Sequence, residues 1–324
     1  MGKGTGKRTG RWLAGVGAVL VVALGTGLGV AFGGTAGADS HGHGRGRDPQ
    51  ASGVDGRDLA ALPGTDYLAL GDSVAFGYRE PTTVPAPNYQ DAASFVGYPE
   101  DVAAALHLKV TNASCPGETS SSFIDASAES NGCENHVSST GQVEPGGYRT
   151  LYPLHVAYQG SQLSFALHFL KTHRDTRLVT LAIGANDGFI CQDTTPDHCT
   201  TPSELDPVLA RITKNVGTIL RDIRDEAHYR GQIVIVNYYS LDSANALDNA
   251  ATAALNAAMD AGAKPYDVEI AHGHALFAAD STYSKDDECT AGLLTQLSSG
   301  GCGVHPSPAG QSVLAQAVEE AVHL

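Results

Sequence analysis

Two short segments near opposite ends of the chain carry residues that could act together in nucleophilic catalysis. Gly71-Asp72-Ser73 follows an apolar run, and His305 lies in Gly303-Val304-His305-Pro306-Ser307-Pro308. A serine hydroxyl becomes an effective nucleophile when a neighbouring base takes its proton, and histidine suits that role because its pKa lies near neutrality. The alternatives are a helix cap at Ser73 and a surface histidine. The two prolines after His305 favour a positioned base.

Two further residues could stabilise the negative charge that develops when a nucleophile attacks a carbonyl group. Gly117 has no side chain, so its backbone N–H can approach a ligand closely. Asn186, in Gly184-Ala185-Asn186-Asp187, can donate its side-chain amide to an oxyanion. A Pro-Gly turn and an Asx-turn are the alternative interpretations of these two positions.

Three of these residues, Ser73, Gly117 and Asn186, follow segments that are typical of strands. The fourth, His305, precedes a predicted helix. Strands are predicted at Tyr67–Leu70, Leu178–Ile183 and Gln232–Val236, with weaker candidates at Leu108–Asn112 and Asp267–Ile270. Helices are predicted between them and at the C-terminal end, over Pro99–Leu106, Gln159–His173, Leu205–Tyr229, Ala244–Ala261 and Ser307–Val322. This alternation predicts an α/β fold with a parallel sheet covered by helices on both faces. Active sites in such folds collect at the carboxyl ends of the strands.

The joint occurrence of these motifs resembles the SGNH or GDSL hydrolase family, whose four motif blocks centre on a Ser, a Gly, an Asn and a His. Matched residue by residue, the blocks fall on Ser73, Gly117, Asn186 and His305. The resemblance covers roughly residues 65 to 324. It implies a flavodoxin-like three-layer α/β/α fold and hydrolysis of carboxylic esters. Ser73 would be the nucleophile and His305 the base, and the N–H groups of Ser73 and Gly117 with the Asn186 amide would form the oxyanion hole.

One position departs from the family pattern. The family usually has an aspartate three residues before the histidine, where this chain has Cys302. A disulfide-bonded cysteine accepts hydrogen bonds poorly, so another group must orient the histidine. A backbone carbonyl in residues 298–303 is the simplest candidate and predicts a Ser–His dyad. Asp286 and Asp287 are the alternatives, because a bridge from Cys289 to Cys302 would bring them close.

The N-terminal 38 residues have the pattern of a signal peptide. A start with four cationic side chains precedes an apolar run from Trp12 to Phe32, and Ala36-Gly37-Ala38 supplies a cleavage site. An uncleaved anchor is the competing interpretation. Residues 39–60 are Gly-rich and polar, typical of a flexible linker, which leaves 61–324 as the hydrolase domain. We expect a secreted protein with no membrane anchor once the leader is removed.

All six cysteines follow the predicted leader. An even number in an exported protein indicates disulfides. Pairing in sequence order would close short loops, and it is the simplest of several possible pairings. The residues are Cys115, Cys133, Cys191, Cys199, Cys289 and Cys302.

Charge and chemistry limit the partners. The formal net charge of −15 makes nucleic acid an unlikely ligand. Serine hydrolysis needs no cofactor and no metal. His272-Gly273-His274 and Asp286-Asp287-Glu288 resemble metal-binding patterns, but ordinary strand-end and solvated-loop explanations account for them.

The substrate class is left open by the sequence. A lipase, esterase or phospholipase and a carbohydrate acetyl esterase share the same motifs, and a non-catalytic binding module on the same fold is a further alternative. The segment 120–158 is rich in Ser, Gly and Asn, and it is interpreted as a lid, a wall of the acyl pocket or a disordered insertion. No sequence pattern indicates the length of the acyl chain, the alcohol part of the ester or the oligomeric state.

Overall fold

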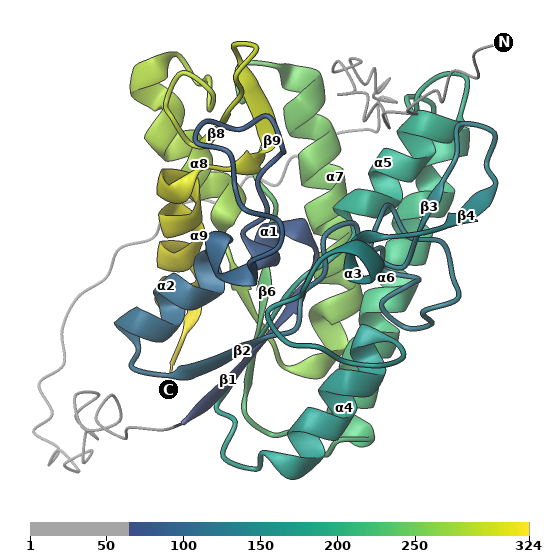
Figure 1. The fold of residues 1–324 in the computed structure, drawn as a ribbon, viewed down its shortest axis with the longest axis vertical. Coiled ribbons are helices and arrows are strands. Elements are labelled where there is room, and N and C mark those ends of the chain that lie inside the picture. Colours follow the sequence, from purple (N-terminus) through teal and green to yellow (C-terminus); the bar gives the residue numbers. More distant parts are fainter. Residues whose placement is uncertain (1–64, 324) are drawn as a thin grey trace, which may run out of the picture.

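The core of the molecule is a five-stranded parallel sheet (Figure 1). The structure is a computed structural model, and it describes residues 65–323. The predicted signal peptide and linker lie outside the described residues. The strand order is β2-β1-β5-β6-β7. The strands span Asp66–Gly71 (β1), Lys109–Asn112 (β2), Leu178–Ala182 (β5), Gln232–Val236 (β6) and Glu269–Ala271 (β7). Numbered among themselves, these strands have the 2-1-3-4-5 order of flavodoxin-like folds, which confirms the predicted fold class.

Helices cover both faces of the sheet, as predicted from the alternation of strands and helices. One group is α2 and α9, with α8 beside α9, and the other is α4, α6 and α7 (Figure 1). The strands between them are near-continuous apolar runs because both of their faces are buried. The helices span Tyr98–Ala105 (α2), Gln162–Thr172 (α4), Pro202–Asp225 (α6), Ala246–Ala263 (α7), Gly273–Ser281 (α8) and Pro308–Ala321 (α9).

The helix ends differ from the predicted ends by a few residues, for local reasons. α4 begins at Gln162 because the Ser161 side chain accepts a hydrogen bond from the N–H of Ser164. α6 begins three residues earlier than predicted, since Pro202 suits a first helical turn, where no N–H partner is needed. α9 begins with Pro308, and the Ser307 side chain accepts from the N–H of Gly310. This cap fixes the start of α9 three residues after His305.

Shorter elements surround the carboxyl ends of the strands. Three are the helices α1 (Ser73–Phe76), α3 (Tyr148–Leu151) and α5 (Ala185–Thr194). Two are antiparallel hairpins, one of β3 (Asn135–Val137) and β4 (Val143–Pro145), the other of β8 (Leu294–Gln296) and β9 (Cys302–Pro306). The segment 120–158 contains the first hairpin and α3, and Phe123 is fully buried in the core. That segment is therefore a packed part of the domain. No helix within residues 65–323 has both the length and the apolar character needed to cross a bilayer.

All six cysteines lie in pairs with disulfide geometry, and the pairs follow the sequence order. The Cα–Cα distances are 5.7 Å for Cys115–Cys133, 5.4 Å for Cys191–Cys199 and 5.7 Å for Cys289–Cys302. Such distances lie in the range typical of disulfides.

We predict that the oxidised protein contains these three bridges and no free thiol. Each bridge closes a short loop, with sequence separations of 18, 8 and 13 residues. Peptide mapping by mass spectrometry without reduction should recover the three linked peptide pairs. A different pairing, or alkylation of two or more cysteines in the folded protein, would contradict the prediction.

Candidate active site

Ser73 and His305 meet at the carboxyl end of β1. Ser73 is the first residue of α1, and His305 lies in β9, just before α9. The His305 Nε2 atom lies 3.0 Å from the Ser73 Oγ, although the two residues are 232 positions apart in the chain. This distance permits proton transfer from the hydroxyl to the imidazole.

The group that orients His305 is Glu80, which the sequence analysis missed. The Glu80 Oε1 lies 2.7 Å from the His305 Nδ1. The expectation that a backbone carbonyl in residues 298–303, or Asp286 or Asp287, lies beside the Nδ1 was therefore wrong. The Asp287 carboxylate instead accepts two hydrogen bonds from Thr290. A carboxylate beside Nδ1 places the Nδ1 proton on that side and leaves Nε2 free to accept.

Glu80 reaches His305 from the loop after α1, whereas the family's aspartate lies three residues before the histidine. One backbone contact and one glycine make this approach possible. The loop after α1 lies against the β8–β9 hairpin, where the Ser298 N–H donates to the Thr82 carbonyl at 2.7 Å. A Cβ at Gly303 would lie 2.1 Å from the Glu80 Oε1, so only glycine leaves room for the carboxylate. The only sequence signal for Glu80 is a carboxylate seven residues after the nucleophile, which is too weak to single it out.

The Glu80 carboxylate is held in its charged form. Burial by itself raises its pKa, but the hydrogen bond and the charge of His305, helped by Thr295, outweigh burial and lower the pKa to about 2. The Thr295 hydroxyl donates to Oε2 at 2.7 Å, and the Val304 N–H donates to Oε1 at 3.0 Å. Glu80 therefore remains an anion across the pH range in which a histidine acts as a base.

Gly117 and Asn186 lie beside Ser73, as the sequence predicted, and Gly117, Asn186, Ser73 and His305 line one cavity. Gly117 has φ +85°, and a Cβ there would lie 2.5 Å from the Asn131 carbonyl oxygen, so glycine is required. The Asn186 Nδ2 donates to the Glu118 carbonyl at 3.0 Å, and its Oδ1 accepts from the Asn131 Nδ2 at 2.9 Å. Because the Asn186 Oδ1 faces Asn131, the Nδ2 must lie on the other side of the amide group.

A buried polar network joins the end of β1 to the loop that carries Gly117. The Gln162 side chain bonds both backbone groups of Gly71, accepting from N–H at 2.6 Å and donating to the carbonyl at 3.0 Å. The same Nε2 donates to the Glu118 carboxyl at 3.1 Å. Burial, with the neighbouring Glu134, raises the pKa of Glu118. The network sets the position of the Gly117 loop relative to Ser73.

One cluster among residues 65–323 has the spacing of a metal site, and it consists of Cys115, Glu118 and Cys133. The two cysteines are joined to each other, so neither provides a thiolate ligand. The cluster is explained by the disulfide, and the His272 and Asp286 patterns do not form a site of this kind in the described part of the chain.

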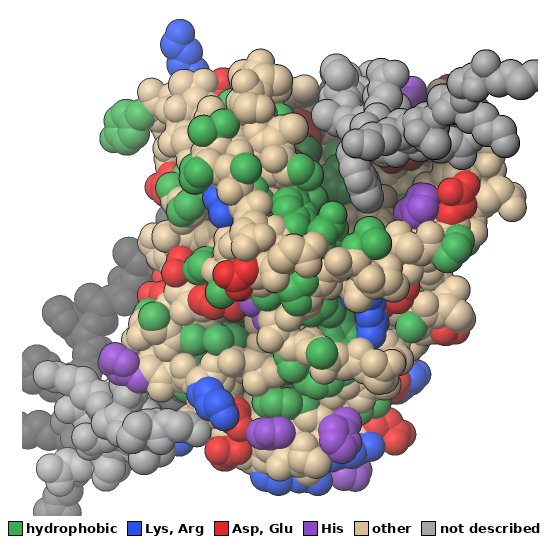
Figure 2. Space-filling view, in the orientation of Figure 1, with side chains coloured by type: hydrophobic (Ala, Val, Ile, Leu, Met, Phe, Trp, Pro, Cys, Tyr) green, Lys and Arg blue, Asp and Glu red, His purple; other side chains and the backbone are tan. Residues whose placement is uncertain are grey.

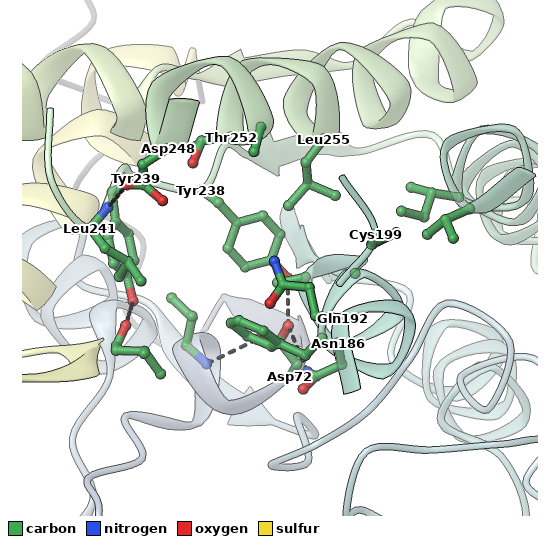
Figure 3. Close-up of a pocket in the computed structure, with 18 of the residues that line it drawn as sticks. Asp72, Asn186, Gln192, Cys199, Tyr238, Tyr239, Leu241, Asp248, Thr252 and Leu255 are labelled. Carbon is green, nitrogen blue, oxygen red and sulfur yellow. Dashed lines mark hydrogen bonds between the residues drawn. The ribbon is translucent and has the colours of Figure 1, made fainter. Parts of the chain in front are cut away.

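Asp72 is a fully buried carboxyl group next to the nucleophile. Its Oδ2 accepts from the Tyr238 hydroxyl at 2.5 Å and from the Asn186 Nδ2 at 3.3 Å, and its Oδ1 accepts from the Val74 N–H at 2.9 Å. In Figure 3, Asp72, Asn186 and Tyr238 lie together at the floor of the pocket. Burial raises the pKa of Asp72 from 3.8 to about 6, and the bonds from Tyr238 and Val74 oppose that rise.

Two cavities meet at Ser73 and His305. The first, which we call the aliphatic pocket, lies among α5, α6 and α7 and has a volume of about 150 Å³ (Figure 3). Its apolar lining includes Leu205, Val208, Leu209, Ile212, Leu241 and Leu255. The second, which we call the tyrosine pocket, has a volume of about 230 Å³ and is lined by Tyr78, Tyr89, Tyr148 and Tyr152. The face shown in Figure 2 is hollowed between α1 and α3, where hydrophobic side chains gather.

The raised pKa of Asp72 predicts a pH-dependent contribution to stability. Because the folded-state pKa of about 6 lies above the ordinary 3.8, the folded protein binds this proton more tightly than the unfolded chain. Relative to Asp72→Asn, the wild-type protein should therefore become more stable as the pH falls from about 7 to 4. Urea unfolding of both proteins across this range measures the difference. Asp175→Asn, at an exposed position, controls for removal of one charge, and a constant difference for Asp72→Asn would contradict the prediction.

Comparison with known proteins agrees with this geometry. The model of the GDSL-like Lipase/Acylhydrolase family matches residues 69–313. Among curated proteins, no sequence matches this chain. The match runs from within β1 to within α9 and includes Ser73, Glu80, Gly117, Asn186 and His305.

Solved structures with a similar fold include three ester hydrolases. Phospholipase A1 from Streptomyces albidoflavus NA297 is 18% identical, with a TM-score of 0.49 over 80% of this chain and 99% of that one. The extracellular lipase from Streptomyces rimosus is 19% identical, with a TM-score of 0.45 over 80% of this chain and 100% of that one. An acetyl xylan esterase from Geobacillus stearothermophilus is 13% identical, with a TM-score of 0.45 over 81% and 96%. On the family match, this chain belongs to the GDSL-like lipase/acylhydrolase family and is a carboxylic ester hydrolase.

Proposed function

We propose that the protein is a secreted serine esterase of the lipase type, with Ser73 as nucleophile, His305 as general base and Glu80 as the residue that orients the base. One observation carries the proposal. A continuous chain of hydrogen-bond contacts runs from the Ser73 Oγ to the His305 Nε2 at 3.0 Å and from the His305 Nδ1 to the Glu80 Oε1 at 2.7 Å. This is the order of nucleophile, base and carboxylate that acyl transfer requires.

The reaction follows from these contacts in two halves. The Ser73 Oγ attacks the ester carbonyl carbon while its proton passes to the His305 Nε2, and Glu80 stabilises the imidazolium that results. The imidazolium then donates that proton to the leaving alcohol oxygen, which leaves an acyl group on Ser73. Water repeats the sequence and releases the acid.

The oxyanion is assigned to the N–H groups of Ser73 and Gly117 and to the Asn186 amide. The Asn186 Oδ1 is engaged by Asn131, so its two N–H groups face the opposite side, where they donate to the Glu118 carbonyl at 3.0 Å and to Asp72 at 3.3 Å; an oxyanion would take the N–H of the longer contact. Losing one such donor typically lowers the rate about 10²- to 10³-fold. Preorganised donors act strongly here because the surrounding groups are buried.

The aliphatic pocket supports an acyl chain of several carbons. Its lining reaches from Ser73 to side chains of α6 and α7, beyond what a two-carbon acetyl group could contact. We therefore favour a lipase or esterase over a carbohydrate acetyl esterase. A non-catalytic module was favoured only by the missing aspartate, and Glu80 now supplies a carboxylate at that place. Secretion is proposed from the N-terminal leader pattern together with the three disulfides.

The substrate proposal predicts a preference for acyl chains longer than acetyl. With p-nitrophenyl esters of 2 to 12 carbons, kcat/KM should peak at an intermediate length, because each buried CH₂ contributes about 0.8 kcal/mol until the pocket is full. Ser73→Ala should lose nearly all turnover of every ester. Leu255→Trp should shift the optimum to shorter chains, since Leu255 lines the pocket.

Leu247→Trp is the matched control for this profile. Leu247 lies on the same helix as Leu255 but outside the pocket lining, so the profile should keep its optimum. An acetyl-only profile would favour the carbohydrate esterase alternative, and full activity in Ser73→Ala would reject the nucleophile.

The role of Glu80 predicts a large loss of turnover in Glu80→Gln. Glutamine keeps the volume but removes the charge that stabilises the imidazolium, and an equivalent change in a serine protease lowers kcat about 10⁴-fold. We expect a loss of about 10²- to 10⁴-fold in kcat with a small change in KM. Asp287→Asn should retain most activity. Circular dichroism checks that both variants fold, and a Glu80→Gln enzyme with more than a tenth of wild-type kcat would argue for a Ser–His dyad.

A further inference from the structure

The tyrosine pocket and the aliphatic pocket open from the same reacting atoms in different directions. Both are lined by Ser73, Asn186 and His305, so an ester bound across them has its carbonyl at the junction. The aliphatic pocket suits the acyl chain because its lining is apolar and extends from Ser73 to α6 and α7. The tyrosine pocket is then left for the other part of the ester, the alcohol.

The position of His305 agrees with this division. The leaving alcohol oxygen receives its proton from His305, so the alcohol must lie on a side of the ester that this ring can reach. Tyr78 packs edge-on against the His305 ring, with 4.8 Å between the ring centroids. An alcohol that leaves next to His305 therefore enters a space bounded by the tyrosines.

The wall of this pocket is made of tyrosine rings that hold one another in place. The centroid distances are 5.9 Å for Tyr78–Tyr89, 5.0 Å for Tyr89–Tyr152 and 5.2 Å for Tyr148–Tyr152. Buried Phe76 packs behind them, 5.3 Å from Tyr148. Such a wall offers broad, rigid apolar surface with hydroxyl groups at its edges, which suits a ring-shaped ligand. Within residues 65–323 the buried Tyr148 hydroxyl has no hydrogen-bond partner.

The charges around the pocket exclude a phosphate group. Within the described part of the chain, no Lys, Arg, Asp or Glu side chain lines the tyrosine pocket. The nearby Arg79 guanidinium is turned away and donates to the carbonyls of Ser94 at 2.9 Å and Pro85 at 3.3 Å. The net charge of −15 also disfavours an anionic ligand.

A quaternary ammonium group is also a poor fit. Among residues 65–323 no carboxylate lines the tyrosine pocket, so its wall offers a cation no counter-charge. The Glu80 carboxylate next to His305 is already bonded by His305, Thr295 and Val304. A cation entering the pocket would lose water without gaining a counter-charge.

We propose that the tyrosine pocket is the alcohol subsite and that it selects uncharged alcohols with a ring over alcohols that carry a phosphate or a quaternary ammonium group. This inference rests on the proposed function and adds the class of alcohol to it. Aryl alcohols and sugars share the required chemistry, namely an uncharged ring that lies against the tyrosines.

The test compares esters with one acyl group, hexanoyl, and five alcohols: methanol, benzyl alcohol, glucose, choline and glycerol 3-phosphate. We expect kcat/KM for the benzyl or the glucose ester to exceed that for the choline and phosphoglycerol esters about tenfold or more. The better of the two ring esters identifies the natural source of the ring. Equal or faster turnover of either charged ester would overturn the inference.

A variant links this preference to the pocket. Tyr152→Ala removes one wall and should lower kcat/KM for the preferred ring ester about fivefold to tenfold, mainly through KM, with a smaller loss for the methyl ester. Tyr283→Ala, at a fully exposed tyrosine outside the pocket, is the matched control and should not change the ratio. An equal loss for the ring and methyl esters in Tyr152→Ala would show that the pocket does not bind the alcohol. Absence of Ser73-dependent turnover of every ester would instead reject the proposed function, and the inference with it.

Discussion

The hydrogen bond between Glu80 and His305 joins the two parts of the chain that complete the site. Glu80 belongs to the loop after α1, and His305 belongs to the strand before α9. The 2.7 Å contact requires the glycine at position 303, because any Cβ there would occupy the place of the carboxylate. It also requires the β8–β9 hairpin, which the Cys289–Cys302 bridge ties to the preceding loop. The cysteine at the position of the usual aspartate thus supports the hairpin, while a carboxylate from another segment lies beside the His305 Nδ1.

The other half of the site depends on buried polar groups that satisfy one another. Gln162 bonds both backbone groups of Gly71 and also reaches Glu118, so β1, α4 and the Gly117 loop share one network. Asp187 accepts from the N–H and the hydroxyl of Ser120, at 2.8 Å and 2.7 Å. Buried polar groups are costly when unpaired, but here each bond restricts the position of a loop near Ser73. The rigidity that a preorganised oxyanion hole needs follows from these bonds.

Recognition of the substrate is separated from the chemistry in space. Ser73 and Asn186 lie in the first turns of α1 and α5 and His305 lies in β9, whereas the two pockets extend from them to α6, α7, α3 and the loops around them. A fold of this kind can keep its catalytic groups and change its substrate by altering the covering segments. In this chain the segment 120–158 supplies Tyr148 and Tyr152 to the tyrosine pocket, and it is therefore a packed part of the domain and not a detached insertion.

The sequence by itself determined the features that depend on local pattern. Apolar runs bounded by turn residues located the strands at 67–70, 178–183 and 232–236, and the sequence also located α2, α4, α6, α7 and α9 to within a few residues at their ends, but not α5 or α8. The order of strands and helices then placed Ser73, Gly117 and Asn186 at one sheet edge, because parallel strands present the same end to the same side. Only the tertiary structure decided that Glu80 lies beside the His305 Nδ1 and that tyrosines from two separate segments form one wall. Those contacts join residues far apart in the chain, 225 positions apart for Glu80 and His305, and no local periodicity records which distant side chains become neighbours when loops pack over a sheet.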